Sequence, residues 1–112
     1  MQDDVFKTKV VFKMLPEAPG CSRACIAFLL DVPTIAGIHI MTYMHVGQHS
    51  EAYAGFYYEL RPATPDEYAD LKEELESMGY ELEVLKKCNA WDYASKNYTK
   101  HMLEMLDKQA NL

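Results

Sequence analysis

The chain has 112 residues, of which 49% are hydrophobic and 25% are charged, and its formal net charge is −6 at pH 7. This composition is typical of a folded globular protein and excludes a disordered tail, a collagen-like repeat and a coiled-coil rod. Neither a repeat nor a Gly/Ser-rich linker interrupts the sequence, so we expect a single domain over residues 1–112.

Two strands are predicted in the first third of the chain. Residues 5–15 alternate, with Phe12 on one side and Lys13 on the other, which favours a strand with one face in water. Residues 25–30 are apolar at every position. This pattern predicts a central strand covered on both faces, although a short buried helix would give the same pattern.

The next two segments differ in how clearly they can be assigned. Residues 38–46 alternate between two sets of side chains and predict a third strand. For residues 51–60 we favour a short helix capped by Ser50, since four apolar residues have helical spacing: Tyr53, Phe56, Tyr57 and Leu60. The aromatic density and Gly55 leave a strand as the alternative.

Residues 65–78 carry the strongest local signal for a helix. Thr64 can cap its first turn, Pro65 suits the first helical position, and Glu67 completes a capping box with Thr64. Gly79 suits the position that ends a helix.

A strand and a helix complete the predicted order. Residues 80–84 alternate strictly, and Asn89 can cap a last helix, with Asp92 three positions later. The elements follow the order β-β-β-α-α-β-α. We therefore predict an α+β fold, with an antiparallel sheet of about four strands and helices packed on one face.

Two cysteines and two histidines are the candidate metal ligands: Cys21, Cys25, His45 and His49. Thiolate and imidazole groups are the ligands that zinc prefers. However, His39 and His45 would lie about 20 Å apart along one strand, so they cannot share an ion. We expect no cofactor and a buried, structural Cys25, and zinc on the four residues is the alternative.

The same residues would serve a hydrolase in which His49 activates Cys21 or Cys25 as the nucleophile. No family signature surrounds either cysteine, and burial of Cys25 would disfavour its thiolate. The sequence also contains no glycine-rich phosphate loop and no nucleophile elbow. These features favour a protein that is not an enzyme.

The last helix has more apolar surface than one packed stripe requires. Tyr and Met are favoured at contact surfaces between proteins. We therefore predict an interface, either of a homodimer or with another protein partner, at five residues: Trp91, Tyr98, Met102, Met105 and Leu106.

Residues 64–85 hold eight acidic residues and a single base, Lys72. This charge would repel phosphate, so we do not expect nucleic-acid binding. A solvated outer face explains the acids most simply. The alternative is a surface that imitates nucleic-acid phosphates and inhibits a basic DNA-handling protein.

Cysteine usage and hydropathy indicate a cytoplasmic protein that does not contact membranes. Three cysteines do not make a paired disulfide framework, and we expect no secretory signal at the acidic N-terminus. The longest nearly apolar stretch, residues 25–30, is far shorter than the about 20 residues of a membrane helix.

Three stretches resemble small uncharacterised proteins that bacterial phages, plasmids and integrative elements carry. They are His45-Val46-Gly47-Gln48-His49-Ser50, Arg61-Pro62-Ala63-Thr64-Pro65-Asp66-Glu67-Tyr68 and Cys25-Ile26-Ala27-Phe28-Leu29-Leu30-Asp31. The resemblance covers residues 21–84 and implies a bacterial, cytoplasmic accessory role, and it identifies no catalytic residue in this chain. The sequence as a whole predicts a non-enzymatic interaction protein.

Overall fold

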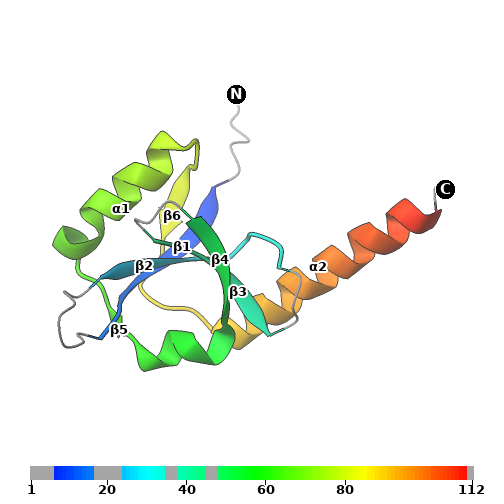
Figure 1. Cartoon of the computed structure of the whole chain (residues 1–112), viewed down its shortest axis with the longest axis horizontal. Helices are drawn as coiled ribbons and strands as arrows, with labels where there is room; N and C mark the ends of the chain where they lie inside the picture. Colours follow the sequence, from blue (N-terminus) through cyan, green and yellow to red (C-terminus); the bar gives the residue numbers. More distant parts are fainter. Residues whose placement is uncertain (1–6, 17–23, 35–37, 45–47, 111–112) are drawn as a thin grey trace.

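The computed structural model describes residues 7–16, 24–34, 38–44 and 48–110 (Figure 1). One sheet contains all six strands in the order β4-β3-β2-β1-β5, and β6 pairs with β1. The strands are β1 (Thr8–Met14), β2 (Cys25–Leu29), β3 (His39–Met44), β4 (Gln48–Tyr53), β5 (Arg61–Pro62) and β6 (Leu82–Val84). The helices are the 3-10 helix η1 (Ala54–Glu59) and the α-helices α1 (Pro65–Ser77) and α2 (Ala90–Ala110).

The predicted α+β class is confirmed. Strands β1 to β4 form an antiparallel meander, as the short connections between the predicted strands indicated. The sheet has six strands instead of about four, because β4 and β5 were not predicted as strands. Strand β6 is parallel to β1 and is the exception to the antiparallel pairing.

The helices lie on both faces of the sheet, so the prediction that they share one face is wrong. One buried cluster joins Val10 and Phe12 of β1 to Leu71 of α1. A second cluster joins Val11 of β1 to Ala94 of α2 and to η1. Successive residues of a strand point to opposite faces, so α1 and α2 cover opposite sides. Because β2 is buried on both faces, each face of the sheet needs a layer of helices to cover it.

Strand β1 has no face in water, contrary to the sequence prediction. Lys13 is only 6% exposed because η1 covers that side of the strand. Its ammonium group donates a hydrogen bond to the Leu60 carbonyl at 3.3 Å and lies 4.1 Å from the centre of the Tyr57 ring. Burial lowers the pKa of Lys13. Contacts with a carbonyl and an aromatic face thus replace part of the water that this ammonium loses.

The predicted helix over residues 51–60 is also wrong in its first three residues, which belong to β4. Ser50 lies inside β4, where its carbonyl accepts a hydrogen bond from the Thr42 hydroxyl at 2.9 Å. Pairing with β3 satisfies the backbone of β4, and the chain turns into η1 only at Ala54. Ala54 and Tyr57 are buried one turn apart, as the three-residue turn of a 3-10 helix requires.

Helix α1 begins and ends close to the predicted positions. The Thr64 hydroxyl accepts a hydrogen bond from the Glu67 amide, and the Glu67 carboxylate accepts one from the Thr64 amide, so the predicted capping box is present. After α1, Gly79 has a φ of +105°, which favours glycine. The Tyr80 amide then donates back to the Leu75 carbonyl, and this Schellman arrangement ends the helix.

Candidate functional site

Helix α2 is attached to the sheet by its first two turns. The Asn89 side chain caps it by accepting a hydrogen bond from the Asp92 amide at 3.1 Å, as predicted. Ala90 and Ala94 are buried against the sheet. Asn97, which is 6% exposed, donates a hydrogen bond to the Leu30 carbonyl at 2.6 Å. This bond is the last buried contact of α2 with the sheet among the residues that the structure describes.

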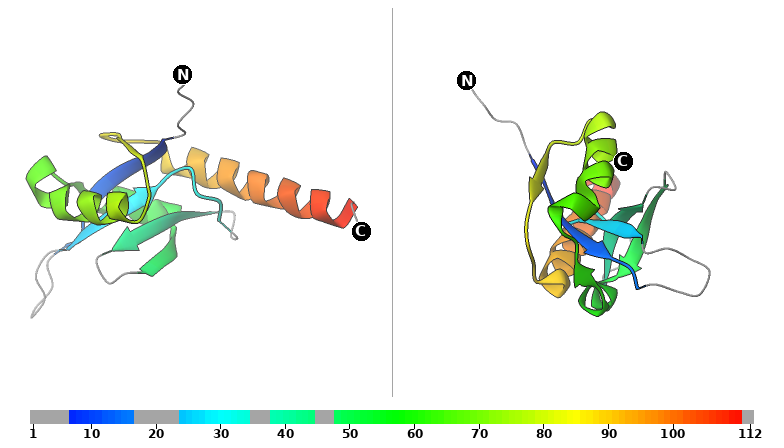
Figure 2. Two further views of the ribbon diagram at one scale, coloured as in Figure 1. Left: turned by 90° about the horizontal axis from the view of Figure 1, so that it is seen from above. Right: turned by 90° about the vertical axis from the view of Figure 1, so that its left-hand side faces the viewer.

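Beyond Asn97 the helix projects away from the sheet (Figures 1 and 2). From Tyr98 to Lys108 every side chain is exposed except His101, which is half-buried. The radius of gyration is 15.2 Å, against about 13 Å for a compact domain of this length. The projecting half of α2 contributes to this extended shape.

Helix α2 keeps large apolar side chains in solvent, from Trp91 in its first turn to Leu106 in its projecting half. The five residues predicted as an interface, Trp91, Tyr98, Met102, Met105 and Leu106, are between 36% and 56% exposed. Leu103, which widens this surface, is 61% exposed. Since large exposed apolar patches are uncommon on monomeric proteins, the surface is a candidate for binding another molecule.

The exposed residues are arranged as a narrow row along the helix. Five of them follow each other at alternating intervals of four and three positions: Trp91, Ser95, Tyr98, Met102 and Met105. We call this row the α2 seam. Alternation of this kind is the a/d pattern of helices that pair as a coiled coil. At 3.6 residues per turn, the seam lies about 90° around the helix from the residues that face the sheet.

Strand β4 extends the α2 seam at its N-terminal end. The Trp91 and Tyr53 rings meet edge to face, with their centres 5.3 Å apart. Tyr53 is itself 49% exposed, at the end of the edge strand of the sheet. Helix α2 and β4 therefore form one continuous aromatic and aliphatic surface.

The charges of α2 balance, unlike those of the chain as a whole. The helix contains three lysines and three acids, whereas the whole chain has a net charge of −6. The excess of acids lies in residues 64–85, largely on α1. Three of these acids have partners within the chain: Glu67 pairs with Arg61, Glu76 with Lys72, and Glu74 accepts from Tyr43.

The four predicted metal ligands cannot all be compared with the structure. Cys21 and His45 lie outside the described residues. Cys25 is 8% exposed, and burial, reinforced by the charge of Glu67, raises its pKa to about 12. In the described ranges no three His, Cys, Asp or Glu side chains come together as metal ligands would. Because its thiol stays protonated, Cys25 suits the structural role better than a nucleophile or a ligand.

His49 belongs to a polar network that the sequence did not reveal. Its Nε2 atom is hydrogen bonded to the Tyr80 hydroxyl at 2.8 Å, and its ring centre lies 5.0 Å from that of Tyr43. The Tyr43 hydroxyl donates to the Glu74 carboxylate, which raises the pKa of Tyr43. Both hydrogen bonds join residues 31 positions apart, so no local pattern could predict them. The network ties β3 to α1 and β4 to Tyr80, which follows α1.

Comparison of the chain with protein-family models, with curated proteins and with solved structures finds no match. Among the described residues, no helix combines the length and the apolar character needed to cross a lipid bilayer.

Proposed function

We propose that this protein is a non-enzymatic interaction module that forms a homodimer through the α2 seam. The observation that carries the proposal is a row of exposed side chains along α2, four of them large and apolar. The row begins in the first turn and continues onto the half of the helix that projects from the sheet. Burying such side chains against a partner contributes roughly 1.5–3 kcal/mol each when burial is complete. Leaving the seam exposed to water is therefore less favourable in free energy than burying it against a partner.

The length of the projecting half also supports a partner. Tyr98 to Ala110 is thirteen residues, about 20 Å of helix, and lies beyond the last buried contact with the sheet. Isolated helices of this length are marginally stable in water. Packing along the seam would stabilise the helical state of this segment.

A second copy of the chain is the partner that the seam fits best. Two-fold dimers use the same surface on both subunits, and a heptad row is self-complementary when two helices supercoil. Each copy carries a charge of −6, so two copies repel each other where the acids lie. Helix α2 has no net charge and allows two copies to approach.

Sedimentation equilibrium or light scattering at micromolar concentration tests the proposal. We expect a mass of twice the 12.9 kDa of one chain. Met102→Glu places a charge in the projecting part of the seam and should give a monomer with unchanged circular dichroism from the sheet. Lys100→Glu is the control, because Lys100 lies on the opposite side of the helix.

Lys100→Glu should remain a dimer although it changes the net charge by two units and Met102→Glu changes it by one. A wild-type chain that stays monomeric at tens of micromolar would refute the homodimer. A dimeric Met102→Glu variant would show that the copies meet elsewhere. The accessory role on bacterial mobile elements and the cytoplasmic location stay predictions from the sequence.

A further inference from the structure

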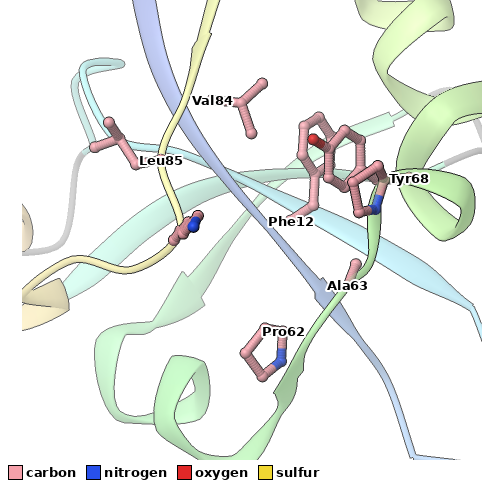
Figure 3. A pocket seen from close by; sticks show the side chains of 8 residues that line it. Phe12, Pro62, Ala63, Tyr68, Val84 and Leu85 are labelled. Atoms are coloured by element: carbon pink, nitrogen blue, oxygen red, sulfur yellow. The ribbon is translucent and has the colours of Figure 1, made fainter.

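A pocket of about 370 Å³ opens beside β1, among residues that the proposed dimer does not use (Figure 3). It lies where two short strands share one edge of β1. Strand β5 runs antiparallel to the C-terminal end of β1, and β6 runs parallel to its N-terminal end.

The pocket exists because the segments that contain β5 and β6 diverge from each other along the edge of β1. The Ala63 amide donates to the Phe12 carbonyl at 3.0 Å, after which the chain turns into α1. The Leu85 amide donates to the Val10 carbonyl at 2.8 Å, after which the chain leaves for α2. Since neither segment continues along the middle of this edge, the side chains there surround an open space.

The walls of the pocket are apolar and partly rigid. Phe12 and Tyr68 stack with their ring centres 4.4 Å apart and an angle of 12° between the rings. Figure 3 shows this pair on one side of the space and Leu85 on the other, with Val84 and Pro62 at the rim. The volume lies within the range of small-molecule sites, and stacked rings present a flat surface to a further aromatic ring.

One cation stands among these apolar residues. Lys86 lines the pocket, and its ammonium has no ion-pair partner in the part of the chain that the structure describes. The carboxylate of Glu67, which precedes the pocket residue Tyr68 in the chain, is held by Arg61 at 2.5 Å and by the Thr64 amide at 2.9 Å. An anionic group on a ligand would therefore meet a lysine that the protein does not neutralise.

We propose that this pocket binds a small aromatic carboxylate. The aromatic ring lies against the Phe12 and Tyr68 pair, and the carboxylate lies beside the ammonium group of Lys86. The apolar walls select a planar ring, and Lys86 distinguishes an acid from a neutral analogue of the same shape.

Titration of the ¹⁵N-labelled protein with indole-3-acetate, followed by amide chemical shifts, tests the proposal. We expect saturable shifts at residues 12, 63, 68 and 84–86. Indole-3-acetamide, which has the same ring without the charge, should bind about two- to fivefold more weakly, the range of an exposed ion pair. The Lys86→Gln variant should remove this difference, and Lys87→Gln, beside it but outside the pocket, should retain it.

Ala63→Phe fills the pocket and should abolish the shifts, whereas Ala69→Phe makes the same change on the exposed side of α1 and should leave them intact. The absence of saturable shifts up to millimolar indole-3-acetate would overturn the proposal. Equal binding of the acid and the amide by the wild type would overturn the role of Lys86. The comparison of the acid with the amide on the wild-type protein remains a decisive test even if the Ala63→Phe variant does not fold.

Discussion

Asn97 holds α2 on the sheet, and replacing it tests how strongly the helix is attached. Its side-chain amide donates to the carbonyl of Leu30, 67 positions away, and both residues are buried. Asn97→Ala leaves this carbonyl without its donor. A buried acceptor left unsatisfied costs about 1–3 kcal/mol, so we expect the free energy of unfolding to fall by that amount. This is a large share of the 5–15 kcal/mol typical of a small domain.

Urea denaturation measures this loss. Trp91 is the only tryptophan, and its contact with Tyr53 makes its fluorescence a probe of the start of α2. Far-ultraviolet circular dichroism follows the whole chain, and the two transitions should coincide if the helix and the sheet unfold together. All variants must be compared at one protein concentration, because dimerisation makes stability depend on it.

Two further variants determine whether loss of the hydrogen bond to Leu30 causes the loss of stability in Asn97→Ala. Asn97→Asp keeps the shape of the side chain but directs a carboxylate oxygen at the Leu30 carbonyl, so it should cost more than alanine. Lys100→Ala, at an exposed position of the same helix, should change stability by less than about 0.5 kcal/mol. If Asn97→Ala also stays within about 0.5 kcal/mol of the wild type, the bond does not hold α2 in place.

Three other predictions concern α1 and its ends. Hydrogen bonds from Arg61 and Thr64 lower the pKa of Glu67 from 4.5 to about 2. Its ionised form therefore stabilises the fold above pH 4.5, and this contribution is lost as the pH falls towards 2. Glu67→Gln should flatten the pH dependence of the unfolding free energy in that window, and an unchanged slope would contradict the argument. In urea denaturation, Leu71→Ala should lower the free energy of unfolding by about 2–5 kcal/mol because Leu71 is fully buried. Leu71→Met, which nearly conserves the side-chain volume, should lower it by less than about 1.5 kcal/mol. Gly79→Ala should lower the free energy of unfolding by about 1–2 kcal/mol in the same assay, because Gly79 has a φ of +105° that alanine rarely adopts. The space around Gly79 is open, so no steric clash adds to this cost. A neutral result would show that this backbone relaxes.

The sequence determined the elements whose hydrogen bonds close within a few residues. Helix α1 is the clearest case, because Thr64 and Glu67 cap it and Gly79 ends it, all within 16 positions. The first three strands were also predicted, since alternation and apolar runs follow from the geometry of a strand. Four of the five residues of the α2 seam could be named, because an apolar row on a helix is a pattern of one segment; Ser95 was not predicted.

Only the tertiary structure decided which surfaces are covered. Lys13 is buried beneath η1 and donates a hydrogen bond to the Leu60 carbonyl, 47 positions later. Its place in an alternating strand had instead predicted a side chain in water. Residues 48–53 form a strand because the edge of β3 offers backbone partners, so the helix predicted from residue 51 begins only at Ala54. The pocket is built from separate segments that meet on β1, and α2 projects because its last buried residue among the described side chains is Asn97. Whether a side chain is buried depends on segments that come together from distant parts of the chain, so local sequence patterns cannot predict it.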